Sequence, residues 1–182
     1  TTLTPLTLRF LTGKKPGVVS RLNAATLLVD QAGTMAKNQG IESALGFLWT
    51  KLDFVSKFKE LDIKTALLNK AGELFERADS PEYYKWGLRF ASANYTLNRP
   101  AEAKVLLSRV IGYTTSSADQ TLRDKIRYEL VLTYINLKLD GDAFQIAKMI
   151  EAVAVRLSAF WKVVGAKILV SDYVMAKNIL LG

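Results

Sequence analysis

The stretch PEYYKWGLRFASANYTLNRPAEAKVLLSRVIGY, residues 81–113, contains the pattern that decides the fold. Apolar residues recur in it at steps of three and four, which is the period of one face of an α-helix rather than the alternation of a strand. Pro100 interrupts the pattern, because its ring disfavours helical geometry at Arg99. The stretch therefore predicts two short helices, 81–98 and 100–113, joined by a tight turn.

The same helical period continues over the rest of the chain from residue 16 onward. Gly40 is suited to a left-handed helix end, and Ser80 to capping the helix that Pro81 begins. Further helices are expected at 16–38, 41–59, 62–78, 119–138, 142–154, 157–171 and 173–181, with turns at 114–117 and 140–142. The sequence predicts an all-α repeat domain of about nine helices over residues 16–182, after an extended Thr-rich arm or linker over residues 1–15.

The chain has 182 residues and contains neither cysteine nor histidine. The absence of cysteine excludes thiolate catalysis, disulfides and Cys-ligated metals, because each requires the sulfur atom. The absence of histidine removes the usual general base and the commonest transition-metal ligand. Asp140 and Asp142 fit a turn and a helix cap better than a calcium loop, which needs more oxygen ligands. We therefore predict a protein that is not an enzyme and binds no metal or cofactor.

The chain carries 25 Lys and Arg against 17 Asp and Glu, a formal net charge of +8. Such a charge favours an acidic partner surface or serves solubility. No long run of basic residues is present, which disfavours nucleic acid. The most apolar stretch, 160–181, is interrupted by four charged residues, which disfavours a membrane span. We expect a soluble protein, but its compartment is not readable, because the sequence begins with Thr1 rather than Met and any signal peptide or anchor upstream of it would not be seen.

An internal repeat is indicated by small residues that follow turns. Ala103, Ala143 and Ala176 each lie early on a second helix. Small residues at recurring distances allow neighbouring helices to approach closely. The spacing is irregular, because the step from Ala103 to Ala143 is longer than the step from Ala143 to Ala176, and the helix at 62–78 has no obvious partner. An irregular helical bundle is therefore the alternative to a repeat fold.

The motif Trp161-x2-Val164-Gly165-x2-Ile168 resembles the tetratricopeptide repeat (TPR), whose unit of about 34 residues carries Trp-x2-Leu-Gly-x2-Tyr on its first helix. The resemblance covers about residues 16–181. It implies a right-handed solenoid of antiparallel helix pairs. It also implies that Trp161 packs between helices and that Gly165 lies at a close helix crossing.

The resemblance further implies a groove lined by the first helix of each pair, which binds a segment of another protein. The function expected is a non-catalytic, chaperone-like adaptor or scaffold that holds a peptide or helix, such as an acidic one, within a larger assembly. The residues expected to bind this partner are Lys85, Arg89, Ser92, Thr96, Lys125, Tyr128, Asn136, Lys162 and Leu169. Lys85 and Arg89, one helical turn apart, suit a carboxylate and look like half of the carboxylate clamp of some chaperone-binding family members.

Two other functions stay open from the sequence. The apolar ending Ile179-Leu180-Leu181 favours a structural subunit that docks through its carboxy-terminal helices, in a homo- or hetero-oligomer. The basic residues among the first 40 favour a binder of nucleic acid or of a membrane surface.

Overall fold

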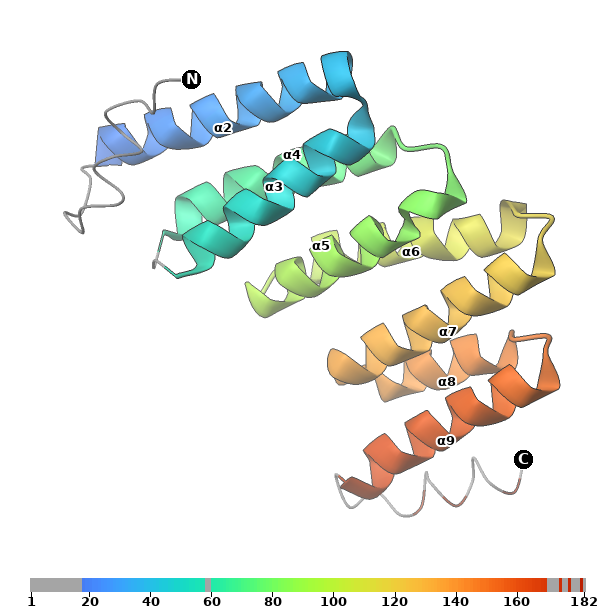
Figure 1. The fold of residues 1–182 in the computed structure, drawn as a ribbon. Helices are drawn as coiled ribbons and strands as arrows, with labels where there is room; N and C mark the ends of the chain where they lie inside the picture. The colour runs from blue at the N-terminus through green and yellow to red at the C-terminus, as the bar shows by residue number, and fades with distance from the viewer. Residues whose placement is uncertain (1–17, 58–59, 170–173, 175–176, 178–180, 182) are drawn as a thin grey trace. The chain divides into compact units, whose positions relative to one another are not determined.

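The computed structural model describes residues 18–57 and 60–169, together with Val174, Lys177 and Leu181. All regular secondary structure in this part of the chain is helical (Figure 1). The α-helices are α2 (Val18–Gln39), α3 (Ile41–Ser56), α4 (Leu61–Glu76), α5 (Tyr84–Thr96), α6 (Pro100–Ser116), α7 (Gln120–Asn136), α8 (Asp140–Lys148) and α9 (Val153–Leu169), and a 3-10 turn, η1 (Pro81–Tyr83), precedes α5. The predicted all-α class is confirmed. The predicted arm at 1–15 lies outside the described residues, as does the predicted helix at 173–181 apart from three positions.

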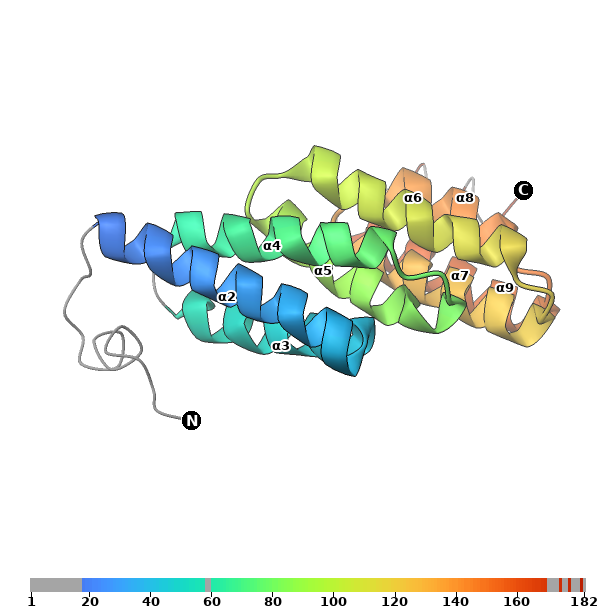
Figure 2. The same ribbon diagram turned by 90° about the horizontal axis from the view of Figure 1, so that it is seen from above.

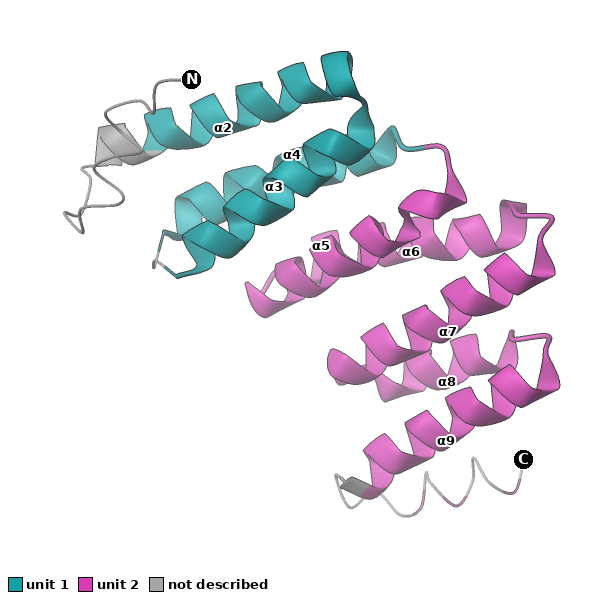
Figure 3. Cartoon of the chain, in the orientation of Figure 1, with its two compact units in different colours: residues 1–78 teal, residues 79–182 magenta. Residues whose placement is uncertain are grey.

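The chain divides into two compact units, Thr1–Ala78 and Asp79–Gly182 (Figure 3). In unit 1, the helices α2, α3 and α4 each pack against the other two. Their shared core includes Leu48, Leu68 and Phe75, which are fully buried. The helix that lacked a partner in the sequence is thus the third member of a three-helix unit, which encloses a core that two helices could not enclose. One repeat domain over residues 16–182 stays a prediction.

Unit 2 is built from antiparallel helix pairs. The helix α5 packs on α6, α7 packs on α8, and α9 packs on both α7 and α8. Within this unit α5, α7 and α9 form one layer and α6 and α8 form the other (Figures 1 and 2). Phe90, Val110 and Leu130 are buried between the layers. This arrangement confirms the predicted antiparallel helix pairs and gives α5, α7 and α9 a common exposed face.

The turns of the two pairs in unit 2 are built alike. Asn98 and Lys138 have φ angles of 58° and 62°, in the left-handed region. The following amide donates back across the helix end, from Arg99 N to the Asn94 carbonyl at 3.0 Å and from Leu139 N to the Tyr134 carbonyl at 2.9 Å. In both turns the helix thus ends with a residue other than glycine in the left-handed conformation.

The predicted turn at 140–142 is wrong, because Asp140 is the first residue of α8. The left-handed residue of the turn is instead Lys138. Lysine has no preference for that conformation, so the residue type did not indicate the turn. The acidic Asp140 and Asp142 lie in the first turn of α8, where negative charge is favourable near unpaired amides. The Asp140 carboxylate also pairs with Lys167 Nζ of α9 at 3.2 Å. The residues predicted to form a turn therefore begin a helix and fasten it to the next.

The predicted boundaries around the polar segment 114–117 also need correction. The helix α6 continues through Ser116, and within it the hydroxyls of Thr114 and Thr115 donate to the carbonyls of Ile111 and Gly112, each at 2.8 Å. These polar side chains are satisfied within the helix and do not end it. The helix α8 ends earlier than predicted, at Lys148, and α9 begins earlier, at Val153.

Gly40 and Gly112 offer a matched test of backbone conformation. Gly40, which precedes α3, has a φ of 90°. At both glycines an added Cβ atom would meet no described atom within 4 Å, so space does not distinguish the two positions. We expect Gly40→Ala to lower the free energy of unfolding by about 1 kcal/mol, because only glycine adopts this φ without strain. Gly112→Ala, within the second half of α6, should raise it by about 0.5–1 kcal/mol. Urea denaturation would show both signs, and equal effects would contradict the expectation.

Candidate functional site

Equivalent positions on α5, α7 and α9 are related by two fixed shifts in residue number, which we call offsets. The first offset superposes the ends of α5 and α7, Thr96 and Asn136, and each of these helices is followed by the same type of turn. The second offset superposes the starts of α7 and α9, Gln120 and Val153, and both of these helices contain 17 residues. Each offset assigns every position of one helix to an equivalent position on the next.

The offsets place most of the predicted binding residues in three rows across the exposed side of these helices. We call this surface the first-helix face. The rows are Lys85, Lys125 and Ser158; Arg89, Glu129 and Lys162; and Thr96, Asn136 and Leu169. The side chains of all of them are exposed except that of Glu129, which is half-buried, and that of Leu169, which lies outside the described residues. Ser92 and Tyr128, also predicted, are half-buried on the same helices.

Several polar groups of the first-helix face are already satisfied. The Ser92 hydroxyl donates to the carbonyl of Leu88 at 3.0 Å, and the Thr96 hydroxyl donates to that of Ser92 at 2.9 Å. The Tyr128 hydroxyl lies 3.4 Å from the Ser158 hydroxyl and joins α7 to α9. The donors of Ser92 and Thr96 are used within α5, so these two hydroxyls can only accept hydrogen bonds from a ligand.

The lysines of the face differ from its arginine. Lys85, Lys125 and Lys162 form no ion pair with any residue that the structure describes. Arg89 instead lies against Trp86, with its Cζ atom 5.0 Å from the ring centre, in a cation–π contact. The carboxylate-binding pair predicted from Lys85 and Arg89 therefore has one exposed lysine without an ion pair among the described residues and one arginine in contact with an aromatic ring.

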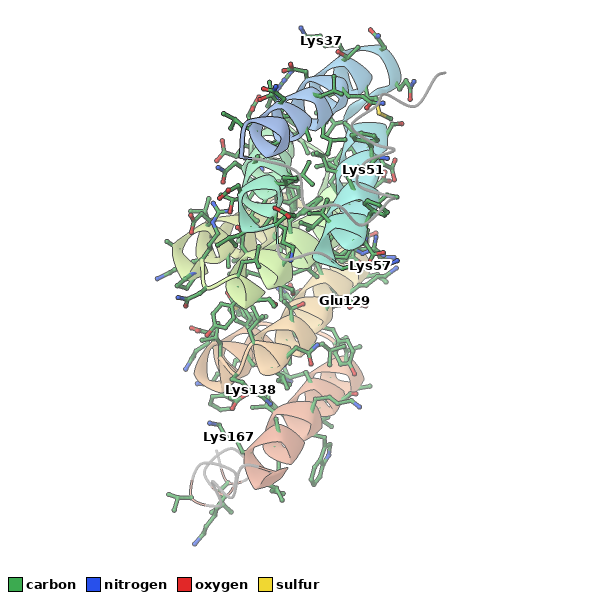
Figure 4. All side chains as sticks on the ribbon, turned by 90° about the vertical axis from the view of Figure 1, so that its left-hand side faces the viewer. Lys37, Lys51, Lys57, Glu129, Lys138 and Lys167 are labelled. Atoms are coloured by element: carbon green, nitrogen blue, oxygen red, sulfur yellow. The ribbon has the colours of Figure 1, made fainter. Side chains whose placement is uncertain are left out.

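Glu129 is a charged residue of the face that was not among the residues expected to bind the partner. It lies on α7 (Figure 4), at the position equivalent to Arg89 on α5. Burial raises the pKa of the Tyr84 hydroxyl, and the negative charge of Glu129 raises it further. The sequence could have located Glu129, because the step from Ala103 to Ala143, when it is counted from Arg89, leads to Glu129.

The segment between α8 and α9 is fastened to α7 by a buried carboxylate. Asp124 accepts hydrogen bonds from the backbone amides of Glu151 at 2.9 Å and Ala152 at 2.7 Å. Arg127 donates to Asp124 at 3.3 Å, to Glu151 at 3.0 Å and to the carbonyl of Met149. Burial by itself would raise the pKa of Asp124, but these donors outweigh it and lower the pKa. The network fixes where α9 starts, and with it the third member of each row of the first-helix face.

Glu151 completes this network at the surface. Its carboxylate accepts hydrogen bonds from Arg127 and from Arg123, whose guanidinium contacts both carboxylate oxygens at 3.0–3.1 Å. These hydrogen bonds lower the pKa of Glu151. Arg123 and Arg127 of α7 are thus engaged with Glu151 and with the segment that precedes α9.

Two expectations drawn from the TPR resemblance are not met by the described residues. Trp161, expected to pack between helices, has 63% of its surface exposed. Gly165, expected at a close helix crossing, would carry a Cβ atom that meets no described atom within 4 Å. Both residues lie on the side of α9 that no described helix covers.

Unit 1 contains a shallow groove of about 330 Å³ between α2 and α4. Its lining is mainly apolar, with Leu22, Val29 and Ala66 among its residues. The polar groups at its rim include Lys70 and Glu73, which pair with each other at 2.8 Å. No group of three or more metal-ligating side chains gathers anywhere in the described part of the chain. We find no converging polar groups in this groove that would define a binding site.

Comparisons with known proteins show similarity in fold only. No protein-family model and no curated protein matches the chain. The chain is similar to crystal structures of the nearly identical TPR-like repeats of a Podosopora anserina protein assigned as a kinesin light chain. For one structure the identity is 16%, the TM-score is 0.42, and the match covers 85% of this chain and 90% of the other. For a single-substitution variant the corresponding values are 16%, 0.41, 91% and 94%.

A helix that crosses a membrane must be apolar over about 20 residues. No helix within the described residues is long and apolar enough to do so.

Proposed function

We propose that the chain is a non-catalytic protein-interaction scaffold whose first-helix face binds an extended acidic segment of another protein. The observation that carries the proposal is the set of three exposed lysines, Lys85, Lys125 and Lys162, one on each successive helix and none in an ion pair with a described residue. Long flexible lysines without partners provide attraction for carboxylates at little cost in desolvation.

The spacing of the lysines suggests the form of the ligand. Packed helices lie about 8–10 Å apart, so equivalent positions on α5 and α7 are separated by roughly that distance. An extended chain advances about 3.3 Å per residue, so acidic residues three positions apart would match Lys85 and Lys125. Lys162 lies one helical turn beyond the row of these two lysines. A segment that crosses the helices with carboxylates at every third position is therefore the ligand that fits best.

The composition supports a binding role over catalysis. The chain contains no histidine and no cysteine. The two carboxylates with a lowered pKa near the face, Asp124 and Glu151, are engaged by amides and arginines that hold the helices together. The lysines of the face are spread over three helices, as binding along an extended partner requires, and do not converge on one reacting atom.

The proposal is tested with a fluorescein-labelled peptide of twelve residues that has glutamate at every third position and serine elsewhere. Lys85→Glu combined with Lys125→Glu should weaken its binding at least tenfold, because attraction is replaced by repulsion. Fluorescence anisotropy measures the dissociation constant. Affinity should also fall as salt shortens the screening length below about 8 Å.

The matched control is Lys104→Glu combined with Lys148→Glu, which makes the same change in net charge on α6 and α8. Both of these lysines are exposed. We expect this control to change the dissociation constant by less than threefold. Equal losses in the two double variants would show that net charge alone attracts the peptide, and the first-helix face would then be rejected as the site.

A further inference from the structure

The helix α9 exposes a row of large apolar side chains. Leu157, Trp161 and Ile168 are 53%, 63% and 47% exposed. They follow one another at steps of one and two helical turns, so they lie on one side of the helix. We call this row the α9 stripe. Tryptophan is seldom left this exposed unless it contributes to an interface.

The equivalence between α7 and α9 shows which side of α9 carries the stripe. The offset that superposes Gln120 on Val153 also pairs the buried residues of the two helices: Ile126 with Ala159, Leu130 with Val163, and Val131 with Val164. All six side chains are at most 1% exposed. The two helices therefore turn the same side toward the core, and the offset describes their orientation as well as their spacing.

The same offset pairs Leu157 with Asp124 and Trp161 with Tyr128. On α7 these two positions point toward the next helix, since Asp124 accepts the amides that precede α9 and Tyr128 reaches Ser158 of α9. The α9 stripe is thus equivalent to the surface of α7 on which α9 packs. At the first two positions α7 is polar and bonded to α9 or to the segment before it, whereas α9 is apolar and exposed there.

We propose that the α9 stripe binds an amphipathic helix of another protein, laid on α9 as α9 is laid on α7. The charge of α9 selects the partner. Val153–Leu169 contains no acidic residue, and its exposed cation is Lys162, since Lys167 pairs with Asp140 and Arg156 is half-buried. A second copy would bring like charges together, whereas a helix with acidic residues beside its apolar row would bring opposite charges together. The α9 stripe itself contains none of the lysines of the proposed function, although Lys162 follows Trp161 directly on the same helix.

The test uses two synthetic helical peptides that share one row of leucines spaced as i, i+4, i+7 and i+11. Glutamates flank the row in one peptide and lysines flank it in the other. The protein carries Trp49→Phe and Trp86→Phe, which leaves Trp161 as the remaining tryptophan of the three in the chain. We expect the glutamate-flanked peptide to shift Trp161 emission to shorter wavelength and to bind at least tenfold more tightly than its counterpart.

Two variants of the otherwise unchanged chain locate the site, measured by anisotropy of the labelled glutamate-flanked peptide. Trp161→Ala should weaken binding at least tenfold. Val105→Ala, which shortens an exposed apolar side chain of α6, should leave binding unchanged. At physiological salt, Lys85→Glu with Lys125→Glu should change it by less than threefold, which separates this site from the first-helix face.

Three results would overturn the proposal. The first is the absence of an emission shift with either peptide, and the second is equal affinity for both. The third is a dimer in sedimentation that Trp161→Ala dissociates, which would show that a second copy covers the stripe.

Discussion

Replacing Asp124 with alanine should lower the free energy of unfolding of unit 2 by about 3–5 kcal/mol. The carboxylate is 5% exposed and receives two backbone amides and Arg127. Its removal leaves Arg127, also nearly buried, without this partner, and leaves two amides at the start of α9 without an acceptor. Urea denaturation in a Trp49→Phe background, followed by the fluorescence of Trp86 and Trp161, reports on unit 2.

The matched control is Asp142→Ala, which removes an exposed carboxylate from the first turn of α8. It should cost less than about 1 kcal/mol, since only a favourable interaction with the helix end is lost. If the two substitutions were equally destabilising, the network around Asp124 would not be what holds α9 on α7.

The effect of Asp124→Ala should depend on pH in one direction. The pKa of Asp124 is lowered in the folded protein. Its contribution is therefore complete above the ordinary value of about 3.9 and is lost as the pH falls toward the folded-state pKa. The difference in stability between the wild type and Asp124→Ala should shrink below about pH 4. A difference that stays constant through that range would contradict the assignment.

Replacing Phe90 with alanine should cost about 3–5 kcal/mol. The ring of Phe90 is 1% exposed and stacks on Trp86, with ring centres 6.1 Å apart. Alanine would leave a cavity between the layers of unit 2 and remove the aromatic contact that positions Trp86 under Arg89.

The same urea assay applies, with Val105→Ala as the control. Val105 is 56% exposed, so this change should stay within about 0.5 kcal/mol. A loss below about 1 kcal/mol for Phe90→Ala would mean that the neighbouring helices close the cavity and that the layers are less rigid than the packing indicates.

Much of the fold follows from local sequence signals. The break at Pro100 and the cap at Ser80, which accepts the Glu82 amide at 3.3 Å, lie where the sequence predicted them. The turn at Lys138 could not be found in this way, because its left-handed backbone is stabilised by the helix-end hydrogen bonds and not by its side chain. The grouping of α4 with α2 and α3 depends on contacts between distant segments, which single-sequence periodicity does not contain.

The candidate site was accessible to sequence reasoning only in part. Exposed lysines on helices predicted to come first in each pair could be chosen from their positions. The role of Arg127 and Glu151 in holding α9 on α7 could not be predicted. A buried arginine and an exposed one have the same local sequence pattern and differ only in the residues that pack on them. The exposure of Trp161 could not be predicted either. A tryptophan in a repeat motif indicates packing, but the motif does not show whether a packing partner is present.

The unequal repeat lengths of unit 2 have a consequence for how such chains vary. The helix α6 has 17 residues and α8 has nine, yet the helices that follow them turn equivalent residues inward. The difference is close to two full turns at about 3.6 residues each. Removing whole turns from the second helix of a pair preserves the inward face of everything downstream, whereas removing half a turn would rotate that face out of the core. Insertions and deletions in these helices should therefore be tolerated in steps of whole turns, and a search for one constant repeat length would overlook the relationship between the pairs.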